Sequence, residues 1–109
     1  MTVVELTNKL ELEVLSLPCP EREICGVYAG DLLSWVMGRA DEGNVWATIM
    51  TNQNVLAVAT LIQVSCVLIC ENCPVDDDLI ALAKDKQVNL LRTSRTLYEA
   101  CAALAEAKL

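Results

Sequence analysis

The feature that most constrains the fold is an apolar segment, residues 55–70, which only Thr60, Gln63 and Ser65 interrupt. A membrane-spanning helix needs about 20 predominantly apolar residues, so this segment is too short to span a bilayer. We interpret it as a helix over 55–62, apolar on all sides and buried, followed by a strand over 65–70. That strand shows no alternation of polar and apolar residues, which is typical of a parallel strand buried on both faces.

Strand and helix patterns alternate from residue 24 to the end of the 109-residue chain. We expect strands over 24–28, 45–50, 65–70 and 88–91. The apolar residues expected to face the core on the remaining three helices are Leu32, Leu33, Val36 and Met37, then Leu79, Leu82 and Ala83, then Leu97, Ala100, Cys101 and Leu104. Short connections between such elements imply right-handed crossovers. The sequence therefore predicts an α/β fold in one domain, 1–109, with a mostly parallel sheet covered by helices on both faces.

Polar residues mark the expected helix starts. Thr2 with Glu5, and Thr96 with Glu99, have the spacing of capping boxes. Asn54 is expected to cap the helix over 55–62. Further starts are expected at Gly30-Asp31 and at the acidic run 76–78, whose carboxylates suit the positive end of a helix dipole. The first helix is followed by a weak strand over 12–15 and a loop at Pro18-Cys19-Pro20.

The charge of the chain excludes several classes of partner. The formal net charge is −7, and the basic residues are scattered, with Arg92 and Arg95 among their closest groupings. Binding to nucleic acid or to an anionic membrane requires clustered Lys and Arg, so we expect neither. The N-terminus has no basic start followed by an apolar run, and the default expectation is a cytoplasmic location.

No catalytic pattern is present. The chain contains no His, the commonest general base and metal ligand, and it has no phosphate loop and no nucleophile elbow. We therefore expect a protein without enzymatic activity and without a cofactor. The acidic run 76–78 is interpreted as a solvated helix start rather than a cation site.

Six cysteines are present in a chain with no export signal, which favours reduced thiols. Cys66, Cys70 and Cys73 have a spacing that holds iron–sulfur clusters in other proteins. Cys66 and Cys70, however, fall on one face of an expected buried strand, about 13 Å apart at 3.3 Å per residue. We therefore interpret them as core residues, as we do Cys25 and Cys101. The alternative is that the loop thiol Cys19 binds a metal together with Cys73, if the fold brings the two together.

The segment 21–34, which reads EREICGVYAGDLLS, resembles the signature of the DRTGG family, an Asp-Arg pair followed by Thr-Gly-Gly-Tyr and Ser-Asp-Leu-Leu-Ser. Further segments resemble later family motifs in order: 42–46 (EGNVW), 51–55 (TNQNV), 55–59 (VLAVA) and 74–79 (PVDDDL). This sequence departs from the signature at Glu21, Cys25 and Val27, and it has Asn52 where a His is common.

The resemblance implies a fold similar to the N-terminal domain of HPr kinases. The family occurs beside CBS domains in regulatory pyrophosphatases, in some phosphotransacetylases, and alone near hydrogenase-type iron–sulfur proteins. The resemblance thus implies an accessory, often dimeric, regulatory domain, and it implies no reaction.

Ligands of parallel α/β sheets bind beyond the carboxyl ends of the strands. The candidate ligand-binding residues expected there are Asp31, Thr51, Asn52, Asn54, Thr93 and Ser94, to which the signature adds Arg22 and Gly26. The alternative is that the polar residues at those strand ends serve only as caps and turn formers. Tyr28 and Trp35 are candidate interface residues, because Trp35 falls on the side of its helix opposite Leu32 and Val36.

Three functions follow from these observations. The first is a non-catalytic regulatory or interaction domain, acting as a homodimer. The second is a sensor of an adenine nucleotide or another phosphate metabolite. The third is an accessory or scaffold protein for an iron–sulfur, hydrogenase-type oxidoreductase.

Overall fold

The structure, a computed structural model that describes all residues 1–109, is built on one five-stranded sheet. The strands in spatial order are β1 (Glu13–Ser16), β5 (Leu90–Arg92), β4 (Cys66–Ile69), β3 (Val45–Thr48) and β2 (Val27–Ala29). β1 pairs antiparallel with β5, and the other neighbours are parallel. The predicted α/β class with a mostly parallel sheet is confirmed.

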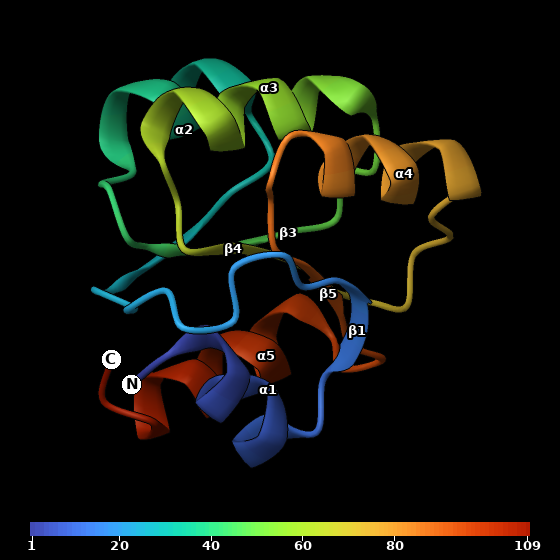
Figure 1. Cartoon of the computed structure of the whole chain (residues 1–109). Helices are drawn as coiled ribbons and strands as arrows, with labels where there is room; N and C mark the ends of the chain where they lie inside the picture. The colour runs from blue at the N-terminus through green and yellow to red at the C-terminus, as the bar shows by residue number, and fades with distance from the viewer.

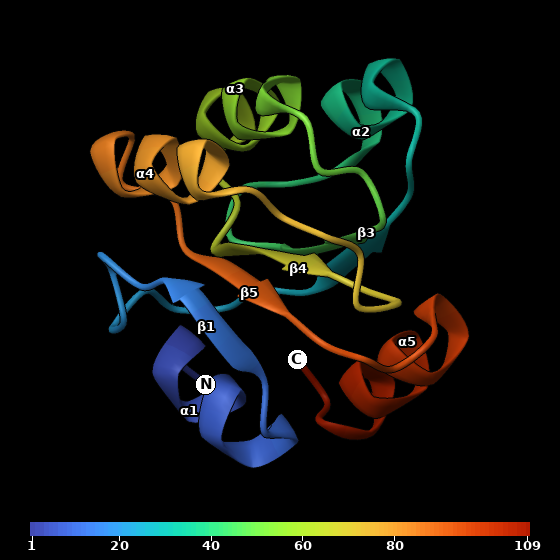
Figure 2. The ribbon, with the colours of Figure 1, turned by 90° about the vertical axis from the view of Figure 1, so that its right-hand side faces the viewer.

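Five helices cover both faces of this sheet (Figures 1 and 2). α2 (Leu33–Arg39), α3 (Gln53–Ile62) and α4 (Asp77–Asp85) lie on one face. α1 (Val3–Leu10) and α5 (Leu97–Glu106) lie on the other face, where both ends of the chain are also found. None of these helices combines the length and the apolar character needed to cross a membrane.

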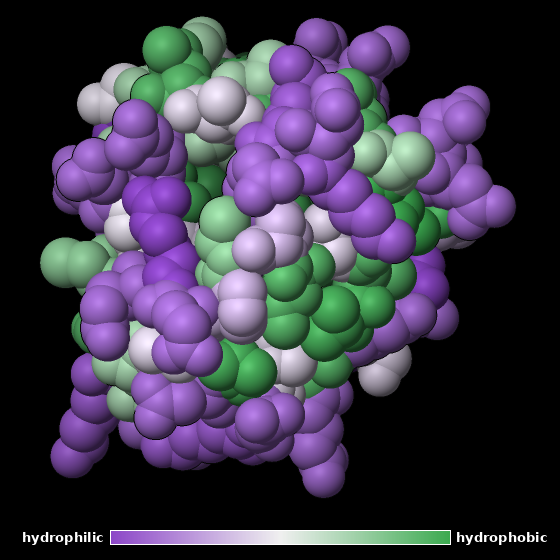
Figure 3. Space-filling view, viewed as in Figure 1, coloured by the Kyte–Doolittle hydropathy of each residue, from purple (hydrophilic) through white to green (hydrophobic).

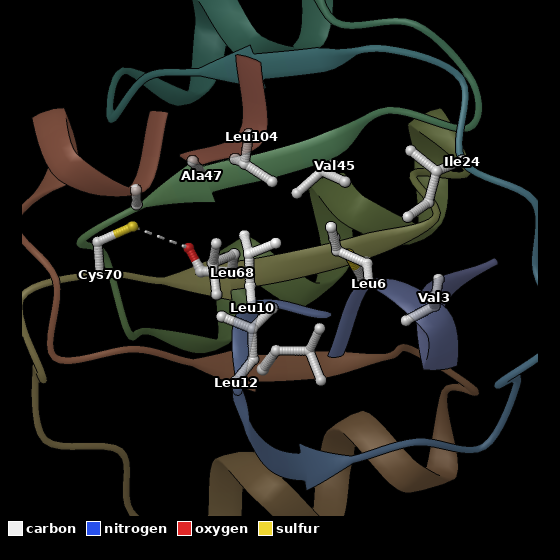
Figure 4. Close-up of a cluster of buried hydrophobic side chains, with 13 residues drawn as sticks. Val3, Leu6, Leu10, Leu12, Ile24, Val45, Ala47, Leu68, Cys70 and Leu104 are labelled. Carbon is white, nitrogen blue, oxygen red and sulfur yellow. Dashed lines mark hydrogen bonds between the residues drawn. The ribbon is translucent and has the colours of Figure 1, made fainter. Parts of the chain in front are cut away.

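Alternate residues of the central strands separate the core into two clusters. Val45, Cys66 and Leu68 point toward α1 and α5, and Figure 4 shows this first cluster closed by Leu6 and Leu104. The intervening residues, which include Trp46 and Val67, point toward α2, α3 and α4 and form the second cluster. All four residues of β3 and of β4 are buried. The absence of alternation in the segment 65–70 therefore arises because both faces of its strand are covered.

The two predicted capping boxes are present at Thr2 and Thr96, but two other expected caps are wrong. Asn52, not Asn54, caps α3, because its side chain accepts a hydrogen bond from the Asn54 backbone N–H at 2.9 Å. Asp31 does not cap α2. Its carboxylate instead accepts hydrogen bonds from Thr48 Oγ1 at 2.6 Å and from the Ile49 backbone N–H at 2.9 Å. A contact between neighbouring strand ends has taken the place of the expected local cap.

The apolar stripe predicted for α2 is also partly wrong. Val36 is fully buried, but Leu32 and Met37 are 56% and 47% exposed. α2 has only seven residues and lies at the β2 edge of the sheet, so a single turn reaches the core. In α3 Leu61 is 70% exposed, so that helix is not buried on all sides as predicted.

The strand predicted over 24–28 begins later, at Val27. Gly26 has φ +78°, which interrupts the extended backbone, and Glu23 forms an isolated bridge with Thr2. Val27 itself is extended and pairs with Val45. The replacement of the second signature glycine by valine is therefore compatible with the backbone, because the positive φ falls on Gly26 alone.

Two glycines give a matched test of these backbone constraints. Gly43 has φ +83°, and an added Cβ would lie 3.2 Å from Cys25 Cβ; Gly38 lies within α2 and has open space around it. We predict that Gly43→Ala lowers the free energy of unfolding by about 1–2 kcal/mol. Gly38→Ala should raise it by about 0.5–1 kcal/mol. Urea denaturation of both variants measures these changes in the free energy of unfolding. Equal changes in the two variants would contradict the backbone conformations described for Gly43 and Gly38.

Candidate functional site

The residues that resemble the family signature are engaged in holding β2 against β3. Asn44 Nδ2 donates to the Cys25 carbonyl at 2.6 Å, and Asn44 Oδ1 accepts from the Asp41 backbone N–H at 2.9 Å. Trp46 Nε1 donates to the Gly30 carbonyl at 2.9 Å. The side chains of Asn44 and Trp46 therefore provide hydrogen bonds to backbone carbonyls on either side of β2. This role is structural.

Arg22 and Gly26 lie at the amino ends of the parallel strands, away from the other candidate ligand residues. Arg22 Nη2 donates to the Gln63 carbonyl at 2.6 Å and so ties the loop before β2 to the end of α3. Around it lies a small cleft of about 170 Å³, lined in part by Lys86 and Gln87. An added Cβ at Gly26 would lie 3.1 Å from Asn44 Nδ2. Both residues therefore have a structural explanation.

The sheet has one topological switch point, between β4 and β5. The helices that follow β2, β3 and β4 all lie on the α2–α4 face, whereas α5, which follows β5, lies on the other face. The loops that leave β4 and β5 therefore lead to opposite faces of the sheet, and ligands of open α/β sheets bind at the carboxyl ends of the strands at such a point. A cleft of about 340 Å³ lies at the carboxyl end of β5, beside the start of β1, and is lined by Leu10, Glu11, Glu13, Asn72, Arg92, Thr93, Ser94 and Arg95. We call it the switch-point cleft.

One wall of the switch-point cleft is an ion pair across the antiparallel strands. Arg92 Nε and Nη2 donate to the two carboxylate oxygens of Glu13 at 2.8 and 3.0 Å. Arg92 Nη1 also donates to the Cys73 carbonyl at 3.2 Å. The hydrogen bonds from Arg92 lower the pKa of the Glu13 carboxyl. This bidentate geometry is the arrangement that guanidinium groups also offer to phosphate.

The second arginine of the cleft has no acidic partner. Arg95 Nη1 donates to the Leu10 carbonyl at 2.8 Å and to Thr93 Oγ1 at 3.4 Å, and Arg95 is in no salt bridge. Glu71 and Asn72, in the facing loop, both have positive φ. Their backbone N–H groups donate to the carbonyls of Arg95 and Thr93, so the loops after β4 and β5 are fixed to each other.

The candidate ligand residues at the carboxyl edge are thus divided between two clefts. Thr93 and Ser94 line the switch-point cleft. Thr51 and Asn52 line a second cleft of about 470 Å³ between the starts of α3 and α4, where the other polar residues are Gln53, Asp76 and Asp78. Asn54 is exposed on the first turn of α3, and Asp31 is engaged with Thr48. The structure does not bring all of these residues into one site.

Sequence reasoning missed Glu13, Asn72 and the two arginines as a group. Arg92 and Arg95 are only three positions apart in the sequence, which was the available signal. Glu13 lies 79 positions from Arg92. Because β1 is antiparallel to β5, its first residue reaches the carboxyl edge.

The cysteines do not converge on a metal site. Cys66 and Cys70 are fully buried in the first cluster, and Cys73 packs against the second, on the opposite face of the sheet. The structure contains no group of three or more His, Cys, Asp or Glu side chains placed to hold a metal ion. Cys25, expected in the core, is exposed, because it precedes the positive φ of Gly26 and lies outside β2.

Exposed apolar side chains concentrate on α2 and β2. Of nine large apolar residues that are exposed, five lie on β2, on or next to α2, or directly after β3: Val27, Leu32, Trp35, Met37 and Ile49. On the side seen in Figure 3, an apolar area also lies where Figure 1 places β1, whose Val14 is 46% exposed. We call the group of five exposed residues at the β2 edge of the sheet the α2–β2 face. Of the two predicted interface residues, Trp35 is 52% exposed, whereas Tyr28 is half-buried against the second cluster.

Comparison with known proteins finds similarity at the level of structure. No family model matches the sequence, and no curated protein matches it significantly. The structure is similar to the CBS and DRTGG domains of the regulatory region of a Clostridium perfringens pyrophosphatase, which is complexed with the activator diadenosine tetraphosphate. The TM-score is 0.75 at 14% identity, over 94% of this chain and 45% of that chain. This likeness establishes a DRTGG-like fold, and the chain spans less than half of that relative.

The positions of the thiols predict their reactivity. Burial raises the pKa of both Cys66 and Cys70 to about 12, and only the thiolate is a good nucleophile. We predict that iodoacetamide at pH 8 modifies Cys25 in the folded protein and leaves Cys66 and Cys70 unmodified until the chain is unfolded in urea. Peptide mapping by mass spectrometry distinguishes the sites. Modification of Cys66 as fast as Cys25 under native conditions would contradict the packing described here.

Proposed function

We propose that this chain is a non-catalytic regulatory domain that acts through association, and that its α2–β2 face binds a second copy of the chain. The observation that carries this proposal is that five of the nine exposed large apolar side chains lie at the β2 edge of the sheet, three of them on or next to α2. Such a concentration on a small protein is typical of an interaction surface. The architectural roles of the signature residues also support it, because they hold β2, the central element of this face, in place.

β2 can contact a second copy of the chain through both its backbone and its side chains. It is an edge strand, so its outer N–H and C=O groups are available to another strand. Tyr28 points toward the second cluster, and alternation then directs Val27 and Ala29 to the face of α1 and α5. Both residues are exposed, so neither helix covers that part of the sheet. Two-fold pairing of β2 with its copy would extend the sheet and cover this apolar area.

Trp35 is the expected anchor of the interface. It is 52% exposed, and the Arg39 guanidinium carbon lies 3.7 Å from its ring centroid. Trp and Arg are the residue types most enriched among those that contribute most to protein association. The cation–π contact also orders both side chains before binding, which reduces the entropy lost on association.

The protein is predicted to be a dimer at high micromolar concentration, and Trp35→Ala should weaken the dimer by about 2 kcal/mol or roughly 30-fold. Sedimentation equilibrium measures both dissociation constants. The matched control is Tyr98→Ala on α5, which removes an aromatic side chain that is 81% exposed on another surface.

The control variant should dimerise as the parent does. A parent protein that is monomeric at this concentration would contradict the homodimer. A dimer that Tyr98→Ala weakens as much as Trp35→Ala does would contradict the location of the interface.

A second candidate function is a sensor of an adenine nucleotide or another phosphate metabolite. Two observations favour it: the switch-point cleft contains two arginines, and the similar pyrophosphatase region binds diadenosine tetraphosphate. The iron–sulfur partner remains a prediction from the sequence, since the thiols lie apart and give it no support.

Thermal unfolding tests the sensor function. A ligand at 100 times its dissociation constant adds about 2.7 kcal/mol to stability, which raises Tm by roughly 10 °C in a domain of this size. We predict such a shift with one or more of ATP, ADP, AMP and diadenosine polyphosphates. No shift with any of them at millimolar concentration would remove this candidate.

A further inference from the structure

We propose that the switch-point cleft binds a phosphoryl group on Arg92 and Arg95, and that Glu13 occupies part of this site until the ligand displaces it. The inference rests on the second candidate function and goes beyond it, because it names the site, the chemical group bound and an internal competitor.

The hydrogen-bond donors of the cleft exceed the acceptors that the chain supplies. Arg95 uses only Nη1 within the chain, so its Nε and Nη2 are available. The Ser94 backbone N–H has no partner within the chain, and neither the Ser94 hydroxyl nor the Asn72 amide takes part in a side-chain hydrogen bond. These donors border one cleft of about 340 Å³. Backbone N–H groups at a turn, together with guanidinium groups, form concavities that bind anions.

The geometry of the existing ion pair indicates which anion fits. The Glu13 carboxylate already occupies Arg92 in a bidentate manner, as a phosphoryl group would. The Glu13 side chain lies at the surface of β1 and is 51% exposed. It can therefore leave the cleft without disrupting the core. A phosphoryl group has three acceptor oxygens, one more than a carboxylate. It can therefore bind Arg92, Arg95 and the Ser94 N–H together, which Glu13 does not.

The two acidic residues that line the cleft do not exclude this ligand. Glu13 is the group that the ligand replaces, and Glu11 is exposed at the end of α1. A third carboxylate nearby, that of Glu71, accepts a hydrogen bond from the Leu97 backbone N–H at 3.1 Å and is thus engaged at the start of α5. Arg95 remains the cation without a carboxylate partner.

The probe for this site is inorganic pyrophosphate, and its affinity is measured by isothermal titration calorimetry with the ¹⁵N chemical shift of Ser94 as a local readout. We expect Glu13→Gln to bind pyrophosphate about tenfold more tightly than the parent, because the competing carboxylate is removed. Arg95→Gln should bind it about tenfold more weakly, as expected for the loss of a charged hydrogen bond. A merely structural role of Glu13 would not produce tighter binding.

Two variants control for net charge. Glu42→Gln, in the turn before β3, makes the same charge change as Glu13→Gln, and Lys84→Gln, at the end of α4, makes the same change as Arg95→Gln. Both residues are exposed and neither lines the cleft, and both variants should bind pyrophosphate as the parent does. Their Tm values, with those of the cleft variants, verify that each chain is folded.

Three results would overturn the proposal. The first is the absence of pyrophosphate binding by both the parent and Glu13→Gln at millimolar concentration. The second is equal effects of the cleft variants and their charge controls. The third is malonate binding as tightly as pyrophosphate, which would assign the cleft to carboxylates.

Nucleotide binding by the same variants distinguishes the proposed phosphoryl site from the proposed nucleotide-sensor function. If pyrophosphate binds as expected and no nucleotide does, the phosphoryl site stands and the nucleotide sensor fails. If nucleotides bind with affinities that Glu13→Gln and Arg95→Gln leave unchanged, the sensor stands and the phosphoryl site fails.

Discussion

Burial of the central strands on both faces is the constraint on which the rest of the structure depends. Every residue of β3 and β4 is buried, so helices must cover each face. The crossovers that follow β2, β3 and β4 place three helices on one face, which leaves α1 and α5 to cover the other. Two helices cover less of the sheet than three, and β2 at the far edge is left exposed on that face. The uncovered edge is thus a consequence of the topology rather than of any single residue.

The same topology explains where a ligand can bind. The loops after β4 and β5 lead to opposite faces of the sheet, because α4 lies on the face of α2 and α3 whereas α5 lies on the face of α1. Antiparallel β1 then brings Glu13 to the carboxyl edge beside Arg92. The switch-point cleft and the α2–β2 face lie at opposite edges of the sheet. Association of two copies through β2 would therefore leave the cleft open to solvent.

Local sequence signals predicted what depends on local structure. Both capping boxes and the inward faces of α4 and α5 were predictable, because each is set by residues three or four positions apart. The unbroken apolar run over β4 predicted that both faces of this strand are buried. The role of Asp31 was not predictable in this way, because its partner Thr48 is 17 positions away and only the pairing of β2 with β3 brings them together. The exposure of Leu32 and Met37 likewise depends on the position of α2 at the sheet edge.

The candidate site was only partly predictable for the same reason. Thr93 and Ser94 follow a strand directly, and the rule for parallel sheets placed them at a binding edge. The ion pair between Glu13 and Arg92 depends on the antiparallel placement of β1, which the weak strand signal near residue 13 did not specify. The resemblance to a family signature identified residues that hold β2, which is a structural role.

Association of the protein through the α2–β2 face is tested most directly by hydrogen exchange at two protein concentrations. Exchange is followed by mass spectrometry at low and at high micromolar concentration. If two copies associate through this face, amides of residues 27–39 exchange more slowly at the higher concentration while those of α1 and α5 are unchanged. Concentration-independent exchange in residues 27–39, or protection confined to α1 and α5, would contradict it.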